Sequence, residues 1–181
     1  MVPVPGAGGV CTRSKKVKVL DGVSMTLARG VCHGLLGHNG AGKSTLLDVL
    51  MGSAHATGGT GHVFGAPLGS RAARSAMGVC PQTDVVIPSL TGREHLRLWA
   101  RFRGVPRLAM DGYIATMLAT VSLSDKADAT LATFSGGMRR RLSILSAVIG
   151  SPDLVVLDEV SNGLDPVQRR HVWEIVASLK S

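Results

Sequence analysis

Apolar and polar residues alternate along residues 16–36, which is typical of short strands that bury one face. Val23, Met25 and Leu27 are separated by polar residues, and Arg29-Gly30 has the composition of a turn. This stretch therefore predicts two or three short strands. Pro and Gly near the start indicate that residues 1–15 form a linker or a disordered terminus.

Two later stretches have the apolar run of a buried strand. Residues 77–80 precede Pro81, and residues 154–157 form a continuous apolar run after Pro152, as expected for a parallel strand covered on both faces. Glycines within residues 58–65 predict a short hairpin between the first strands and these two.

Apolar residues at helical spacing predict helices in the rest of the chain. One covers residues 43–51, one follows Pro106 and one starts at about Pro166. A further helix lies before residue 104, with arginines on one face and an apolar stripe on another, formed by Leu98, Trp99 and Phe102.

Ser135 is expected to open another helix. Its apolar stripe has the spacing i, i+4, i+7, i+11 and consists of Met138, Leu142, Leu145 and Ile149. Residues 139–141 are three arginines, which we expect on the solvated side of this helix.

The 181-residue chain has 20 Lys and Arg against 12 Asp and Glu, a formal net charge of +8. This excess fits nucleic acid, anionic lipid or a phosphate ligand. Aromatic residues make up only 3%, too few for the stacking by which single-strand binders hold bases. No stretch approaches the roughly 18 to 20 apolar residues that span a bilayer, so membrane association is expected to come through a partner.

Residues 37–44, G-H-N-G-A-G-K-S, match the phosphate-loop pattern G-x-x-x-x-G-K-[ST] between a predicted strand and a predicted helix. In such a loop, glycines let backbone N–H groups point at an anion, and the helix N-terminus adds its dipole. Lys43 is expected to reach the β- and γ-phosphates, and Ser44 to ligate Mg²⁺. The alternative is an ordinary glycine-rich turn, and the flanking elements favour the phosphate loop.

Residues 154–159, L-V-V-L-D-E, place two carboxylates at the C-terminal end of a predicted strand, where open α/β sheets bind ligands. Asp158 is expected to hold Mg²⁺ through water, and Glu159 to orient or deprotonate the water that attacks the γ-phosphate. A solvated Asp-Glu pair capping a helix is the alternative. The phosphate loop upstream favours the catalytic interpretation.

Gln82 follows the predicted strand 77–80, so its amide is expected to reach Mg²⁺ or the attacking water. Ser135, Gly136 and Gly137 start a predicted helix and offer a second anion site, unless they form only an ordinary N-cap followed by glycines. Two phosphate sites so far apart in one chain make sense if the second serves another molecule's nucleotide.

Together these motifs resemble the ATP-binding cassette (ABC) ATPases over about residues 16–181. They occur in the order and approximate spacing of that family: Walker A at Gly37–Thr45, a Q-loop glutamine at Gln82, an S-G-G-x signature at Ser135–Met138, Walker B at Leu154–Glu159 and a D-loop at Gly163–Pro166. The sequences G-L-L-G-H-N-G-A-G-K at 34–43, C-P-Q at 80–82 and E-H-L at 94–96 look most like subfamily A, whose members mostly move lipids.

The resemblance implies an α/β fold: a P-loop NTPase core of the RecA-like type, an N-terminal antiparallel β-subdomain, and a helical subdomain inserted at about residues 85–134. It implies ATP and Mg²⁺ as cofactors and a second cassette as partner in a head-to-tail dimer. It also implies transporter transmembrane domains, on the same or a separate chain, that dock near the Q-loop and helical subdomain. The domain would lie at the cytoplasmic face of a membrane, and no nucleic-acid partner is expected.

The same resemblance implies roles for individual residues. Glu159 and Gln82 would be catalytic, and Ser44, Gln82 and Asp158 would hold the metal. The nucleotide-binding residues would be Gly37, Asn39, Gly40, Ala41, Gly42, Lys43, Ser44, Thr45, Ser135, Gly136, Gly137 and Asp165. Of these, Ser135 and Gly137 would face the nucleotide of the partner cassette.

The chain departs from the family pattern in two respects. Its first aromatic residue is Phe64, whereas cassettes usually stack the adenine on an aromatic residue upstream of Walker A. The family's switch histidine lies beyond Ser181, so we expect an ABC domain that is incomplete at its C-terminus. The strand before that histidine belongs between the Walker A and Walker B strands, and without it two ladders would stay unpaired.

The expected function is MgATP binding and hydrolysis that drives export across a membrane, with lipid as the implied cargo. One alternative is a regulatory module that binds nucleotide and has lost hydrolysis, which the missing histidine and stacking aromatic favour. A soluble ABC ATPase acting on nucleic acid is the other, favoured by the charge of +8. Its usual paired cassettes or long coiled-coil insertions do not occur in this sequence.

Overall fold

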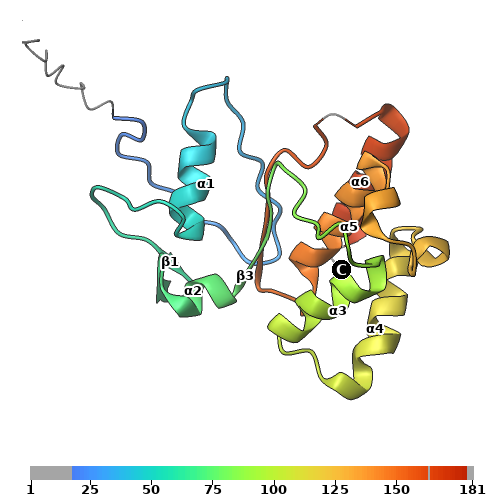
Figure 1. The fold of residues 1–181 in the computed structure, drawn as a ribbon. Coiled ribbons are helices and arrows are strands. Elements are labelled where there is room, and N and C mark those ends of the chain that lie inside the picture. Colours follow the sequence, from blue (N-terminus) through green and yellow to red (C-terminus); the bar gives the residue numbers. More distant parts are fainter. Residues whose placement is uncertain (1–17, 163, 179–181) are drawn as a thin grey trace, which may run out of the picture.

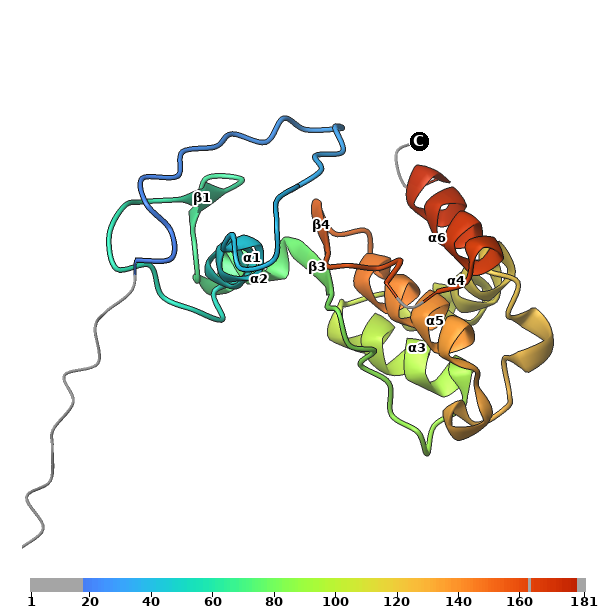
Figure 2. The ribbon, with the colours of Figure 1, turned by 90° about the horizontal axis from the view of Figure 1, so that it is seen from above.

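The computed structural model describes residues 18–162 and 164–178, so the predicted linker at 1–15 lies outside the described residues. A short parallel strand pair, β3 and β4, runs between two groups of elements (Figures 1 and 2): α1, α2 and a β1–β2 hairpin on one side, α3 to α6 on the other. The order is α1 (Lys43–Met51), β1 (His62–Val63), β2 (Ala66–Pro67), α2 (Arg71–Ser75), β3 (Met77–Cys80), α3 (Gly92–Phe102), α4 (Arg107–Thr120), the 3-10 helices η1 (Ser124–Lys126) and η2 (Leu131–Thr133), α5 (Gly136–Val148), β4 (Leu154–Leu157) and α6 (Pro166–Ser178).

The two strands predicted from apolar runs, β3 and β4, are confirmed, and they pair with each other. Met77 lies opposite Leu154 and Cys80 opposite Leu157 in a parallel register. The ladder continues past both strands, because the Asp158 N–H donates to the Cys80 carbonyl at 2.9 Å. Since the strands are parallel, the residues that follow each of them meet at one edge of the pair.

The predicted hairpin is also confirmed, as β1 and β2 with Val63 opposite Ala66. Its two turn residues, Phe64 and Gly65, have φ of 48° and 81°, the left-handed values that a type I′ turn requires. The Arg29 guanidinium lies over the Phe64 ring at 5.3 Å from its centroid, so a cation–π contact ties the N-terminal segment to this turn.

The strands predicted between residues 16 and 36 are not formed in the described part of that stretch, residues 18–36. This part is almost entirely exposed, with Val23 and Met25 at 53% each. A strand needs a neighbour to take up its backbone N–H and C=O groups, and among the described residues no strand pairs with this stretch. Of the expected antiparallel β-subdomain, the described residues form only the β1–β2 hairpin.

The hydrophobic core lies mainly among α3, α4, α5, β4 and α6. Its completely buried side chains include Leu96, Ile114, Leu131, Leu142 and Ile144. A much smaller cluster of Val63, Ala73 and Met77 holds the β1–β2 hairpin and α2 against the start of β3. Helix α1 has no buried residue, so the element that follows the phosphate loop is the least packed of the longer helices that the structure describes.

Helix α3 starts with a capping box in which the Glu94 N–H donates to Thr91 Oγ1 and the Thr91 N–H donates to Glu94 Oε2. Its predicted apolar stripe is wrong, because Phe102 is 73% exposed and the buried side is formed by His95, Leu96 and Ala100. Burial lowers the pKa of His95 to about 4, and its neutral ring accepts a hydrogen bond from Trp99 Nε1 at 3.1 Å.

Helix α5 follows its predicted apolar stripe, but the predicted solvated side is wrong, because Arg139 and Arg141 are half-buried and Arg141 Nη1 donates to the Val121 carbonyl. Ser135 caps the helix, and Leu142, Leu145 and Ile149 are buried, as the spacing predicted. Arg140, expected on the solvated side, is only 4% exposed. Its partners are three backbone carbonyls and the Asp84 carboxylate, which compensate its desolvation.

Gly78 in β3 is where α5 approaches the strand pair most closely. A Cβ there would lie 1.7 Å from the Ala147 carbonyl oxygen and 2.8 Å from the Pro152 ring. We therefore expect Gly78→Ala to force α5 away from the strands and to lower the free energy of unfolding by about 3 kcal/mol, measured by urea denaturation.

Gly112→Ala is the matched control. Gly112 is an exposed residue of α4 with nothing within 4 Å of its Cβ position, so alanine should raise the free energy of unfolding by about 0.5 to 1 kcal/mol. Equal stabilities of the two variants would contradict the close approach of α5.

Candidate nucleotide-binding site

The glycine-rich loop at 37–42 leads directly into α1, as its motif predicts. Gly40 and Gly42 have φ of 83° and 91°, a conformation that residues with a Cβ rarely adopt. A Cβ on Gly37 would lie 3.3 Å from that of Ala41, so the loop closes tightly on itself. Asn39 lies between these positions, and its carbonyl oxygen is 2.9 Å from His38 Nδ1.

Lys43, the first residue of α1, folds back over the loop. Its Nζ donates to the carbonyl oxygens of Gly37 and His38 at 2.7 and 2.9 Å. Ser44 and Thr45 follow in the first turn of α1, and Ser44 is exposed. The ammonium group and the first turn of a helix therefore lie at the same loop, which is the arrangement that binds phosphate groups.

The ends of β3 and β4 bring Gln82 and Glu159 together, although 77 positions separate them in the sequence. Gln82 Nε2 donates to Glu159 Oε2 at 2.7 Å, and Asn162 Nδ2 donates to the same oxygen at 3.1 Å. Glu159 has a φ of 45°, unusual for a residue with a side chain. Two amides thus fix one carboxylate at the edge where a ligand would meet both strands.

Asp158 lies in an acidic environment next to this carboxylate. Burial raises its pKa, and the charges of Glu159 and Asp48 raise it further, while Arg140 and Lys43 act in the opposite direction. Lys43 and Asp48 of α1 are therefore within electrostatic reach of the β4 end. Among the described residues, no three His, Cys, Asp or Glu side chains are grouped so that they could hold a metal ion by themselves, so a divalent cation at Asp158 would need other oxygen ligands as well.

Ser135, Gly136 and Gly137 are not joined to these residues by any hydrogen bond that the described part of the chain makes. The Ser135 hydroxyl oxygen caps α5 by accepting from the Met138 N–H at 3.3 Å, which leaves its hydrogen available to another acceptor. Gly137 is buried against α6, since a Cβ there would lie 2.6 Å from the Gln168 side chain.

Asp165 caps α6. Its Oδ1 accepts from the backbone N–H groups of Val167 and Gln168 at 3.0 and 2.8 Å. Asp165 therefore holds Gln168, which covers Gly137, and the D-loop residue is linked to the signature through this helix start. Gly163, the first residue of the predicted D-loop, lies outside the described residues.

Sequence reasoning missed two residues of this site. Asn162 gave no signal, because a single Asn after an acidic pair predicts nothing by itself. Arg140 did give one: Gly137, Arg140 and Ile144 share one face of α5 by their spacing, and all three are buried. That face turns the arginine toward the strand ends.

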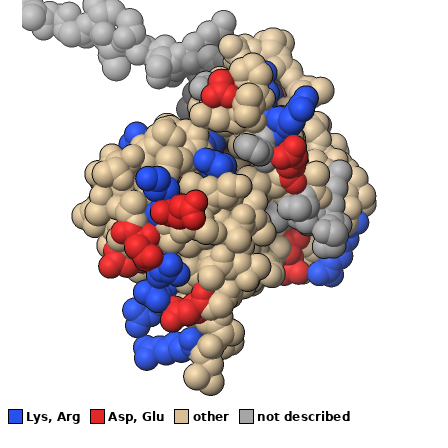
Figure 3. Space-filling view, turned by 90° about the vertical axis from the view of Figure 1, so that its right-hand side faces the viewer, with Lys and Arg blue, Asp and Glu red and all other residues tan. Residues whose placement is uncertain are grey.

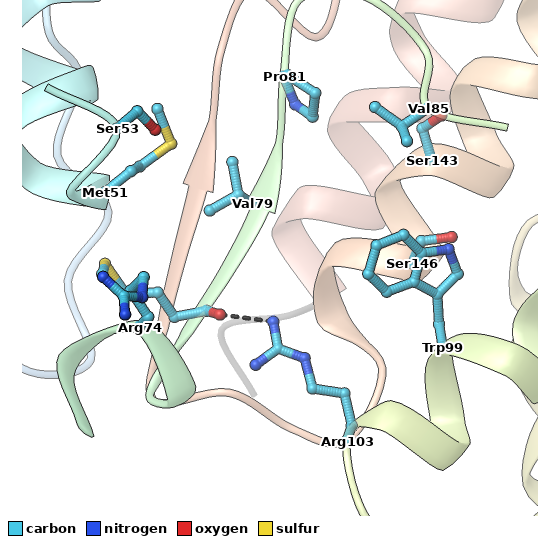
Figure 4. Close-up of a pocket in the computed structure, with 11 residues that line it drawn as sticks. Met51, Ser53, Arg74, Val79, Pro81, Val85, Trp99, Arg103, Ser143 and Ser146 are labelled. Carbon is cyan, nitrogen blue, oxygen red and sulfur yellow. Dashed lines mark hydrogen bonds between the residues drawn. The ribbon is translucent and has the colours of Figure 1, made fainter. Parts of the chain in front are cut away.

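A cavity of about 360 Å³ lies beside β3 (Figure 4), and none of the predicted site residues lines it. Trp99 of α3 and Arg103, just after that helix, face it from one side and Met51 at the end of α1 from the other, with Val79 of β3 between them. Arg103 is fixed there by hydrogen bonds to the carbonyls of Ser75 and Met77. The cavity is thus separate from the residues predicted to bind nucleotide, although Pro81, next to Gln82, also lines it.

Comparison with known protein families identifies the domain. The family model described as ABC transporter matches residues 20–162. The chain belongs to the ABC transporter family. It is an ATP-binding domain of the ATP-hydrolysing ABC class, as its motifs indicated, and the α/β P-loop NTPase fold is confirmed by a solved structure.

That solved ABC structure is described as "Structure of ATP binding subunit of ABC transporter". It superposes with a TM-score of 0.80 at 30% identity, covering 90% of this chain and 68% of the other. Among the described residues of this ABC domain, no helix is both long enough and apolar enough to cross a bilayer.

Curated ABC relatives include Nod factor export ATP-binding protein I of Burkholderia orbicola (strain AU 1054), 44% identical over 163 residues, which are 89% of this chain and 54% of the relative. ABC transporter A family member 2 of Arabidopsis thaliana is 38% identical over 94% of this chain and 18% of its own length. The likeness to subfamily A is therefore confirmed. The chain spans about half or less of the length of these relatives.

Because the pKa of Asp158 is raised in the folded protein, we expect the charge on this carboxylate to lower the free energy of unfolding. The folded protein favours the protonated form, so ionised Asp158 destabilises the fold at pH 7, and this effect disappears as the pH falls through its folded pKa. Without nucleotide or Mg²⁺, Asp158→Asn is expected to raise the urea midpoint at pH 7 and to lose this advantage under acidic conditions.

Asp125→Asn serves as the control, because Asp125 is an exposed residue of η1 and the substitution removes the same charge far from the strand ends. Its urea midpoint should stay close to that of the unchanged chain at both pH values. A midpoint of Asp158→Asn at or below that of the unchanged chain at pH 7 would contradict the prediction.

Proposed function

We propose that this domain binds MgATP and hydrolyses it to drive transport across a membrane by a transporter of which it forms part. One observation carries the proposal: the hydrogen bond between Gln82 and Glu159, which unites the ends of β3 and β4 beside Asp158. The names of the relatives point to export, and lipid as cargo rests on the likeness to subfamily A.

Residues 37–45 would bind the phosphates of ATP. The backbone N–H groups of Gly37, Asn39, Gly40, Ala41 and Gly42 would line the anion, and Lys43 would exchange its two carbonyl acceptors for phosphate oxygens. Ser44 and Thr45 would add hydroxyl groups at the helix start. This division of labour is supported by the tight closure of the loop.

Ser44, Asp158 and Gln82 would hold Mg²⁺, which when bound neutralises the charge that develops on the phosphates. Asp158 supplies the anionic oxygen, and its pKa is raised first by burial and then by the charges of Glu159 and Asp48, which a cation would compensate. Glu159 would orient the attacking water and take its proton. Gln82 and Asn162 hold Glu159 Oε2, which supports a fixed position of that carboxylate.

Two such cassettes would pair head to tail, so that Ser135, Gly136, Gly137 and Asp165 serve the nucleotide bound by the partner. The exposure of Ser135 and Gly136 supports this arrangement, as does the free hydrogen of the capping hydroxyl. In this pairing, the signature segment needs no contact with the phosphate loop of its own chain.

Transmembrane domains would dock at the cavity beside β3, in the helical region that we assign to about residues 85–134. Trp99 and the cationic Arg74 and Arg103 line the cavity, and Phe102 stands 73% exposed in an adjoining hollow. A docked segment would touch Pro81, the residue before Gln82, so movement there would reach the catalytic edge directly.

Charge pairing weighs against a nucleic-acid surface. On the face drawn in Figure 3, Lys and Arg lie interspersed with Asp and Glu. Arg93 pairs with Asp128 and Arg97 with Asp111, each at 2.8 Å, so these arginines are already neutralised by the chain itself. The net charge of +8 is therefore not gathered into one stripe on this face.

Substitutions at two site residues separate binding from hydrolysis. Lys43→Ala should weaken the binding of MgATP at least about 30-fold, because roughly 2 kcal/mol of charge-assisted hydrogen bonds to phosphate is lost. Glu159→Gln should bind MgATP as tightly as the unchanged chain and release phosphate at least about 100-fold more slowly. Calorimetric titration and a phosphate-release assay measure the two quantities.

Lys126→Ala controls for the loss of a positive charge, since Lys126 is exposed in η1, far along the chain from the loop. It should change neither quantity. Tight binding by the unchanged chain without phosphate release, even with a partner cassette supplied, would favour the regulatory module over the transport ATPase. No binding at all would refute both.

A further inference from the structure

Arg140 makes a set of hydrogen bonds that the proposed nucleotide chemistry does not use. Its Nε donates to the Val160 carbonyl at 3.0 Å, and Nη2 donates to the Asp158 carbonyl at 3.0 Å. Nη1 donates to the Pro81 carbonyl at 2.7 Å and lies 3.2 Å from Asp84 Oδ1. The guanidinium group thus holds the residues after β3 and after β4 at the same time.

Breaking this set of hydrogen bonds would cost the folded protein much of its stability. Arg140 is 4% exposed, and a buried charge that loses a partner is expensive, whereas a fully satisfied one is tolerated. Asp84 supplies the compensating charge, and three backbone carbonyls accept from three more of the five N–H donors. Because a guanidinium is planar and rigid, its partners cannot shift independently of one another.

Arg140 lies between the signature segment at the start of α5 and the residues that follow β3 and β4. It lies within one helical turn of Gly137 and less than two turns from Ser135, the residues proposed to face the partner's nucleotide. Pro81 directly precedes Gln82, and Asp158 and Val160 flank Glu159. One side chain therefore joins the signature segment to the segments that follow β3 and β4.

We propose that Arg140 is a positioning residue that couples occupancy of the chain's own nucleotide site to the placement of its signature segment. The inference rests on the proposed function, since it needs nucleotide to bind at Lys43 and Asp158. When ligand draws Gln82, Asp158 or Glu159 into new positions, the adjoining carbonyls carry the guanidinium with them, and α5 follows. Coupling of this kind is reciprocal, so a partner's nucleotide at Ser135 would in turn affect the catalytic edge.

Hydrogen exchange of the 181-residue chain tests the coupling without requiring turnover. Backbone exchange in residues 136–145 is compared with and without the non-hydrolysable analogue MgAMP-PNP, at a concentration where light scattering finds single chains. Arg140→Lys keeps a positive charge for Asp84 and gives up the planar fork. We expect this variant to bind MgAMP-PNP within about threefold of the unchanged chain and to lose the ligand-induced change in α5.

Arg139→Lys is the matched control, because the neighbouring arginine is half-buried and makes no side-chain hydrogen bond among the described residues. It should retain the change in α5. If Arg140→Lys does not fold, the double variant Arg140→Gln with Asp84→Asn replaces it, since removing both charges leaves no buried ion unpaired.

The outcomes are distinct. An α5 response that persists in the Arg140 variants, or one that is missing from the unchanged chain although it binds MgAMP-PNP, would overturn the coupling and leave the proposed function standing. If the unchanged chain does not bind MgAMP-PNP, the proposed function fails and the coupling fails with it.

Discussion

The candidate site depends on the parallel pairing of β3 with β4. The ladder runs from Met77 opposite Leu154 to Cys80 opposite Leu157 and is continued by the bond from Asp158 to Cys80. Because both strands leave the ladder in the same direction, Gln82 and Glu159 meet at its end, where the Gln82 amide donates to the Glu159 carboxylate. The close contact of Gly78 with the backbone of α5 then covers the pair, so the register of two short strands determines where the Glu159 carboxylate lies.

Elements whose pattern is contained within their own residues could be predicted from the sequence. The apolar runs of β3 and β4 and the stripe of α5 are visible in the order of residues, and so are the capping serine and the glycines of the phosphate loop. The segment 18–36 shows the opposite case. Its alternation of apolar and polar residues predicts which face of a strand would be buried, but a strand also needs a neighbouring strand to hydrogen-bond with, and the alternation does not show whether one is present. The prediction that Phe102 is buried was wrong for a related reason. Helical spacing identifies an apolar face, whereas tertiary packing decides whether that face is covered.

Packing is distributed unevenly around the site. Strands β3 and β4 and helix α5 border the large core. Helix α1 contributes no buried residue, and the neighbouring hairpin and α2 pack around only three buried residues, Val63, Ala73 and Met77. Local opening should therefore require less free energy on the side of the phosphate loop than on the side of Glu159. A site built in this way would keep the Glu159 carboxylate in place while the loop adjusts to a ligand.

The bonds from Lys43 to the carbonyls of Gly37 and His38 would make the proposed phosphate binding an exchange of hydrogen-bond acceptors. The loop carries its own counter-ion, so an arriving phosphate gains the ammonium group only by displacing two carbonyl oxygens, which must then find other donors or water. A neutral nucleoside brings nothing to exchange. Discrimination at this loop would thus be based on the charge of the phosphate chain rather than on the identity of the base, in keeping with a chain whose first aromatic residue, Phe64, already lies beneath Arg29.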